Sequence, residues 1–214
     1  PDLSTAQLLH NRLPKDGVAI FLLVAPERVD LVTVDTIQDI EGYARRDRGR
    51  PYADPGRGML PPKVAQMLIN LSLVPPGGAV YDPFCGVGTI PMEALLMGFR
   101  VIASDSAPTQ VERTKENLAW VSEQLPADAP EPQPPHVFVH DIIKEPPDFL
   151  EGFIDVVVTE GWLGPARTTT PLPREAEEVF IKVQNLLSKL FQSAERALKS
   201  SGRIVITLPA FLVK

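Results

Sequence analysis

Short apolar runs that end in an acidic residue recur along this chain, and segments with helical periodicity separate them. Four of these runs end at Asp82, Asp105, Asp141 and Glu160, and a fifth apolar run starts at Arg203. Short apolar runs that alternate with amphipathic helices are typical of buried parallel strands joined by crossover helices. The pattern therefore predicts a doubly wound, Rossmann-like α/β fold with a mostly parallel sheet, whose ligands bind beyond the carboxyl ends of the strands.

The helices and strands of this domain follow from apolar spacing and from the positions of proline and glycine. Helices are expected over 64–73, 90–97, 108–121 and 173–198. Strands are expected over 79–81, 100–105, 137–141, 155–159 and 203–208. The Ser-Ser-Gly sequence at 200–202 is expected to stop the last helix before the last strand begins.

The first 50 residues follow another pattern. Two apolar runs, 18–24 and 29–34, flank a short polar turn, which predicts a small β-hairpin. We therefore expect an N-terminal arm or linker over 1–50 and the main domain over 51–214. Because the chain starts at Pro1 without a methionine and stops just after a strand-like run, we expect a fragment of a longer protein.

Composition narrows the classes of function. The 214 residues carry a formal net charge of −6, which argues against strong non-specific binding to nucleic acid. The single cysteine, Cys85, excludes an internal disulfide framework and fits a reducing, cytoplasmic compartment. No apolar run reaches the length of a membrane span, so no membrane association is expected. The three histidines lack metal-ligand spacing with Cys85, and no metal site is predicted.

The chain is organised around AVYDPFCGVGTI, residues 79–90, where a strand end leads through a glycine-rich turn into a helix. A strand, a glycine turn and a helix in this order bind nucleotide-like ligands at the helix N-terminus. Gly86 and Gly88 are expected to let the backbone approach the ligand where a Cβ would collide. The third glycine of a dinucleotide-binding fingerprint falls at Pro91, which counts against a dehydrogenase. The alternative is a tight turn that only connects strand and helix.

The octapeptide DPFCGVGT resembles the S-adenosylmethionine loop of class I methyltransferases that act on exocyclic amino groups of nucleic-acid bases. Within that group the chain is most similar to tRNA guanine-N2 methyltransferases, whose catalytic domain usually follows an RNA-binding THUMP domain. The segments 46–51 and 58–63 resemble the same family. The resemblance implies S-adenosylmethionine as cofactor, guanine N2 in tRNA as methyl acceptor, and RNA binding through a domain absent from this chain. A small activating protein partner stays open.

Two further strand ends are expected to bind the cofactor. Asp105 lies 19 residues beyond Gly86, close to the spacing at which an acid accepts hydrogen bonds from ribose hydroxyls. The alternative for Asp105 is a helix cap shared with Ser106. Asp141 and Ile142 are expected to meet the adenine, unless they form only a polar strand end. All expected cofactor contacts are Pro61, Asp82, Pro83, Phe84, Cys85, Gly86, Gly88, Thr89, Asp105, Ser106, Asp141, Ile142 and Glu160.

The fourth strand ends in Glu160-Gly161-Trp162, the predicted catalytic turn. The resemblance implies an acid or amide, two prolines and an aromatic residue at this point. An exocyclic base amine is a weak nucleophile, so acceptors for its N–H protons favour attack, and Glu160 is predicted to provide one. Trp162 is predicted to stack on the base, a contact worth about 1–3 kcal/mol in single-stranded sites. Gly161 stands where the family pattern has its first proline, so the catalytic competence of this turn stays open. The alternatives are a plain strand-end acid and a core aromatic.

Arginines cluster in this acidic chain at Arg45, Arg46, Arg48 and Arg50. Arginine suits bidentate contact with phosphates, so we predict that they bind the RNA backbone. The alternative is a solvated face that pairs with nearby acids. Trp162 and Arg167 complete the predicted substrate-binding set.

Two other functions stay open. One is a catalytically weak, RNA-binding or partner-activating subunit that keeps the methyltransferase fold, which Gly161 and the acidic charge motivate. The other is an adenine-N6 or protein-glutamine methyltransferase, which the missing Asn/Asp-Pro-Pro-aromatic sequence disfavours.

Overall fold

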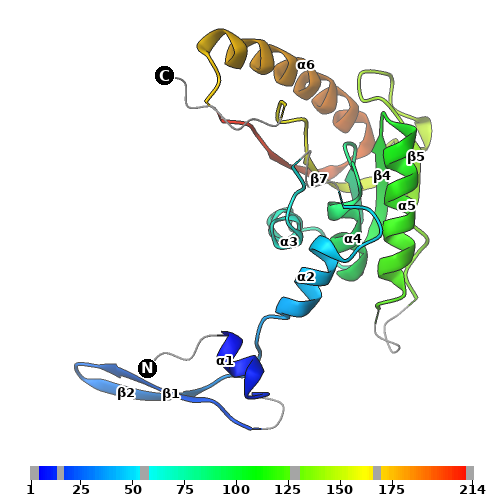
Figure 1. The fold of residues 1–214 in the computed structure, drawn as a ribbon. Coiled ribbons are helices and arrows are strands. Elements are labelled where there is room, and N and C mark those ends of the chain that lie inside the picture. Colours follow the sequence, from blue (N-terminus) through cyan, green and yellow to red (C-terminus); the bar gives the residue numbers. More distant parts are fainter. Residues whose placement is uncertain (1–4, 14–16, 54–57, 126–130, 166–169, 211–214) are drawn as a thin grey trace. The chain divides into compact units, whose positions relative to one another are not determined.

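The computed structural model describes residues 5–13, 17–53, 58–125, 131–165 and 170–210. Contacts divide the chain into two units, Pro1–Ala44 and Arg45–Lys214, and Figure 1 labels most of their helices and strands. The first unit ends at Ala44, whereas the arm is predicted to end at residue 50. The domain boundary stays a prediction.

The first unit contains α1 (Thr5–His10) and a hairpin of two antiparallel strands, β1 (Ile20–Ala25) and β2 (Arg28–Thr33). The predicted hairpin is thus confirmed.

The helix α2 (Ile40–Arg48) contains the point where the two units divide. Asp39 stabilises its start, because the Asp39 carboxylate accepts the Gly42 N–H at 2.9 Å. The apolar pattern predicts no helix here, because this stretch has too few apolar positions to form a periodic face.

The second unit is built on a five-stranded sheet with the order β5-β4-β3-β6-β7, in which every neighbouring pair is parallel. Its strands are β3 (Ala79–Asp82), β4 (Arg100–Asp105), β5 (His136–Val139), β6 (Ile154–Glu160) and β7 (Leu198–Thr207). The chain winds outward from β3 in one direction and then returns to β6 on the other side of β3. This reversal of strand order confirms the predicted doubly wound fold and creates a crevice between β3 and β6.

Helices cover both faces of this sheet, as the alternation of strand side chains requires. They are α3 (Pro62–Leu71), α4 (Thr89–Leu96), α5 (Pro108–Ser122) and α6 (Pro173–Ala197), with a 3₁₀ turn, η2 (Asp148–Leu150). Val80, Val156 and Val158 belong to the apolar core with α3, α4 and α5, whereas Tyr81 and Val157 belong to the core with α6. Among the described residues, no helix combines the length and apolar character needed to cross a membrane.

The last strand begins earlier than predicted. Leu198 follows α6 directly and pairs with Ile154, so the expected helix stop at 200–202 lies inside β7. The register then shifts, and the next pair joins Val156 to Arg203. The extra residues are accommodated as an irregularity in the strand, which Ser-Ser-Gly permits because these small residues bury no side chain.

Candidate functional site

A cavity of about 600 Å³ lies at the carboxyl ends of β3, β4 and β6, where the strand order reverses. This volume is in the range of pockets for drug-sized ligands. The lining residues are Gly58, Met59, Leu60, Asp82, Phe84, Cys85, Gly86, Val87, Thr89, Ile90, Asp105, Ser106, Gln110, Glu160, Gly161, Trp162, Leu163, Gly164 and Pro165.

The end of β4 holds the glycine-rich loop that borders this cavity. Asp105 accepts the Gly86 N–H on Oδ2 at 3.0 Å and the Ala107 N–H on Oδ1 at 2.9 Å. The Cys85 N–H donates to the Ser104 carbonyl at 2.9 Å. Asp105 therefore fixes the loop from the lining of the cavity, and its contact with a ribose stays a prediction. The N-cap residue of α5 is Ala107, so Asp105 is not the helix cap.

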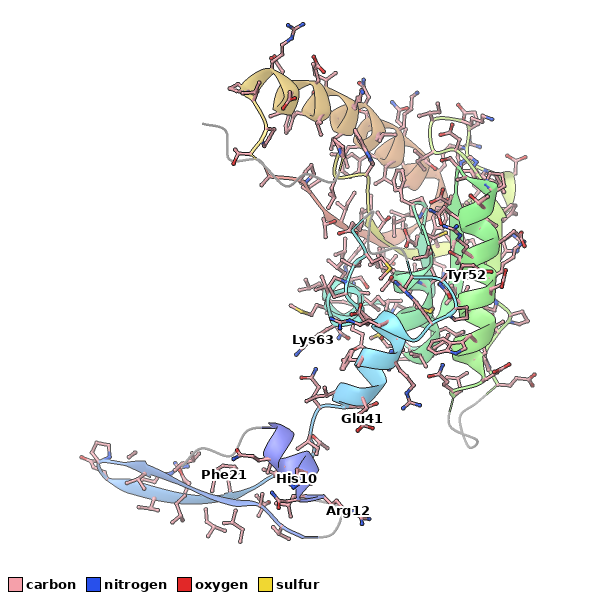
Figure 2. All side chains as sticks on the ribbon, viewed as in Figure 1. His10, Arg12, Phe21, Glu41, Tyr52 and Lys63 are labelled. Carbon is pink, nitrogen blue, oxygen red and sulfur yellow. The ribbon has the colours of Figure 1, made fainter. Side chains whose placement is uncertain are left out.

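Two polar residues of α5 fix the other side of the loop. Thr114 Oγ1 donates to the Gly86 carbonyl at 2.8 Å, and Asn117 Nδ2 donates to the Val87 carbonyl at 2.7 Å. Asn117 also exchanges two 2.9 Å hydrogen bonds with the backbone of Tyr52, which Figure 2 shows beside α5. Sequence reasoning missed both residues. The available signal was that they interrupt the buried face of α5 with polar side chains at helical spacing.

The two loop glycines are needed for different reasons. Gly86 has φ +53°, lines the cavity, and has open space where a Cβ would stand. Gly88 has φ +86°, and a Cβ there would lie 2.9 Å from the Thr114 side chain. Both φ values lie in the left-handed region that favours glycine, and only Gly86 also leaves open space in the cavity lining. Gly88 is required by its backbone conformation and by packing against α5.

Asp82 lies beneath the loop, almost completely buried. Its Oδ1 accepts the Thr159 hydroxyl at 2.6 Å and the Phe84 N–H at 3.1 Å. Burial raises the pKa of Asp82 to about 7, and the charges of Asp105 and Glu160 act in the same direction. These contacts make Asp82 an organiser of the turn at the floor of the cavity.

The predicted catalytic turn forms one wall of the cavity. Burial raises the pKa of Glu160, at the end of β6. Trp162 is 40% exposed and, with Phe84 and Gly161, also borders a small apolar space beside α6 and β7. A Cβ at Gly161 would meet only Ile206, at an ordinary 3.8 Å. The wall thus joins a half-buried acid to an accessible aromatic ring, a combination suited to holding a planar base.

The other predicted cofactor contacts divide into two groups. Phe84, Cys85, Thr89 and Ser106 line the cavity with the acids described above. Burial raises the pKa of the Cys85 thiol, so this side chain lines the site without being a nucleophile. The predicted residues outside the lining are Pro61, Pro83, Gly88, Asp141 and Ile142.

Asp141 and Ile142 lie outside the cavity because β5 is the edge strand of the sheet, two strands from the crevice. Asp141 Oδ1 accepts the Ile143 N–H at 3.2 Å, and Ile142 is buried in the core with α6. These contacts favour the polar strand end over the adenine contact. Sequence reasoning also missed Gln110, which faces the cavity from α5.

The arginine cluster separates into inward and outward side chains. Arg46 Nε pairs with Glu93 Oε1 at 2.7 Å, and Gln66 Nε2 donates to Glu93 Oε2 at 2.6 Å. Arg50 is only 4% exposed and donates to Thr89 Oγ1 and Met59 Sδ, both at 2.8 Å.

Arg46 and Arg50 therefore stabilise the domain and the cavity wall, which speaks against their predicted contact with RNA phosphates. Arg45 and Arg48 remain exposed. Arg167 lies outside the described residues. Within the parts of the chain that the structure describes, no group of acidic, histidine or cysteine side chains is arranged to hold a metal ion.

Comparison with known proteins finds a family match for part of this chain. Residues 48–130 match the family described as RMKL-like, methyltransferase domain. The tRNA (guanine(10)-N2)-dimethyltransferase of Methanothermobacter thermautotrophicus is 32% identical over 171 residues, which cover 78% of this chain and 43% of the relative. The protein of the same name from Pyrococcus abyssi is 28% identical over 168 residues, covering 78% and 42%. These matches confirm the resemblance that DPFCGVGT indicates, and the chain spans less than half the length of these relatives.

Solved structures support the fold. TrmN from Thermus thermophilus has a TM-score of 0.52 and 20% identity, covering 95% of this chain and 54% of that chain. Precorrin-6y C5,15-methyltransferase from Geobacter metallireducens has a TM-score of 0.50 and 17% identity, covering 75% and 68%. At these identities the likeness concerns the Rossmann-like fold alone.

Proposed function

We propose that this chain, whose residues 48–130 carry an RMKL-like methyltransferase domain, transfers a methyl group from S-adenosylmethionine to guanine N2 in tRNA. The observation that carries the proposal is the 600 Å³ cavity, where the glycine-rich loop, Asp105 and the Glu160–Trp162 turn meet. The names of the relatives, tRNA (guanine(10)-N2)-dimethyltransferases, support the substrate class.

The cavity suits the cofactor because its lining offers both an acid and apolar side chains. S-adenosylmethionine supplies a methyl group activated by a sulfonium. Asp105 would hold the ribose, since each carboxylate oxygen accepts one backbone N–H and keeps further acceptor capacity. Gly86 leaves room beside the loop, and Leu60 and Ile90 offer apolar contact. Phe84, Cys85, Thr89 and Ser106 complete the proposed cofactor contacts.

The acceptor base would lie against the Glu160 wall. We propose that the Glu160 carboxylate accepts an N–H proton of the exocyclic amine and that Trp162 stacks on the base, so that the nitrogen lone pair is aimed at the methyl group. Holding two reactants in line can contribute roughly 7–11 kcal/mol to lowering a barrier. Gly161 would allow this turn without strain, since a Cβ there has only ordinary contacts.

Binding of a whole tRNA needs phosphate contacts that this acidic chain supplies poorly. Its net charge is −6, and two of its four clustered arginines face inward. We therefore propose that a separate RNA-binding domain, and in addition a small activating protein, complete the enzyme in the cytoplasm. Arg45 and Arg48 stay as proposed phosphate contacts of this chain.

The proposal is tested by mass spectrometry of nucleosides from tRNA incubated with the protein and S-adenosylmethionine. N2-methylated guanosine is the expected product. Cofactor binding without methyl transfer would favour the non-catalytic alternative, and N6-methyladenosine would change the substrate base.

We predict that Asp105→Ala weakens binding of S-adenosylhomocysteine by about 100-fold, because hydrogen bonds to a charged group contribute about 1.5–3 kcal/mol each. Isothermal titration calorimetry measures this affinity. Glu195→Ala removes an exposed acid of α6, outside the cavity, and should leave the affinity within about twofold. Equal losses for the two variants would contradict the assignment of Asp105.

A further inference from the structure

Gln110 is a buried side chain at the wall of the cavity whose hydrogen bonding is incomplete. It is 7% exposed and lines the cavity from the first turn of α5. Its carboxamide oxygen, Oε1, is shielded from solvent and has no hydrogen-bond partner among the residues that the structure describes. Buried polar atoms are nearly always paired, so the unpaired oxygen of a side chain that lines a cavity indicates that this side chain has a partner still to be identified.

The reason for the missing partner lies in Asp105. Ala107 is the N-cap of α5, and Gln110 stands three residues later. A glutamine at this position commonly accepts the N–H of the N-cap residue in a capping box. Here the Ala107 N–H donates to Asp105 Oδ1 at 2.9 Å instead. Asp105 has therefore taken the usual role of Gln110 and left its amide without a partner in the helix.

The side chain can reorient without disturbing the helix. The terminal torsion of glutamine is broad and roughly two-fold, so a rotation exchanges Oε1 and Nε2. Such a rotation would bring the oxygen acceptor to the side of the cavity that Asp105 and Ser106 also line, and it would move Nε2 into the position that Oε1 now occupies. The ligand group best matched to acceptors at this point is a pair of hydroxyls.

We propose that Gln110 accepts a hydrogen bond from one ribose hydroxyl of the adenosyl cofactor, while Asp105 accepts the other. This inference rests on the proposed function and adds a residue that distinguishes a complete ribose from a deoxyribose. The assignment of one hydroxyl to each residue follows from the hydrogen bonds that the two side chains already make. Each Asp105 oxygen is already engaged with a backbone N–H, whereas the Gln110 oxygen is unengaged.

The test is calorimetry with Gln110→Met, in which an unbranched side chain of similar length replaces the amide. For S-adenosylhomocysteine we expect the Kd to rise about tenfold, as the loss of one neutral hydrogen bond implies. One of the two analogues, 2′-deoxy or 3′-deoxy, lacks the hydroxyl that Gln110 contacts. The wild type and Gln110→Met should bind that analogue equally. Such a double-mutant cycle isolates the contact between amide and hydroxyl.

Thermal unfolding without ligand separates this role from a structural one. Gln110→Met should keep or raise the Tm, because it removes a buried polar atom that lacks a partner. Gln124→Met, the same change at an exposed residue just beyond α5, is the matched control and should alter neither Kd nor Tm.

Three results would overturn the inference. They are a lower Tm for Gln110→Met, an unchanged Kd for S-adenosylhomocysteine, and an equal loss for S-adenosylhomocysteine and both deoxy analogues. If the wild type does not bind S-adenosylhomocysteine at all, the proposed function fails and the inference fails with it. If it binds but Gln110→Met binds equally well, the inference alone fails.

Discussion

Glu160→Gln is expected to lower methyl transfer to tRNA by roughly 10²–10³-fold while the affinity for S-adenosylhomocysteine stays within about twofold. Removing one charge-stabilising group from a transition state has effects of this size. Glutamine keeps the shape of the side chain and loses the negative acceptor for the amine proton. Single-turnover assays with labelled S-adenosylmethionine measure the transfer step, and calorimetry measures binding.

The pH dependence of the same step provides a second check on Glu160. Burial raises its pKa above the ordinary glutamate value, and the carboxylate is the form that accepts the amine proton. The single-turnover rate should therefore increase as pH rises through this raised pKa and then level off, and it should fall in acid. The Glu160→Gln protein should lack this rise. Glu151→Gln, an exposed acid ahead of β6, is the control and should keep the wild-type rate and profile. Full activity of Glu160→Gln would remove this residue from the mechanism.

Arg46→Ala is expected to reduce the free energy of unfolding by about 3–5 kcal/mol, the range found when one partner of a buried ion pair is removed. The cause is Glu93, which is completely buried and would lose its ion pair while it keeps the hydrogen bond from Gln66. Burial already raises the pKa of Glu93, and the Arg46 contact opposes that rise. Urea unfolding followed by circular dichroism measures the change.

Two further variants define the cause of this effect. Arg48→Ala removes a neighbouring arginine that is 89% exposed, and it should alter stability by less than about 0.5 kcal/mol. The double variant Arg46→Met/Glu93→Leu should recover most of the loss, since apolar residues can replace a buried ion pair. An Arg46→Ala protein of normal stability but weaker RNA binding would instead support the phosphate contact predicted from the sequence.

The sequence by itself determined most helices and strands of the fold and the acids at the strand ends, although it missed α2 and the early start of β7. The β-hairpin, the parallel strands and the acids at strand ends follow from local apolar spacing, because the periods of strand and helix depend only on neighbouring residues. The glycine-rich loop is equally local, since strand, turn and helix are contiguous between residues 79 and 96. The family resemblance at DPFCGVGT rests on the same contiguous residues and is confirmed by the relatives.

The tertiary structure decided which of these residues meet. Asp82, Asp105 and Asp141 have similar sequence surroundings, yet one lies beneath the loop, one faces the cavity and one stands at the sheet edge. Arg46 and Glu93 are 47 positions apart, so no local pattern reveals that they pair. Asn117 holds the Val87 carbonyl and the backbone of Tyr52, which lie 30 and 65 positions away in the sequence. Strand order and long-range side-chain contacts set these roles, because periodicity reports which face a residue occupies and not which residue lies opposite it.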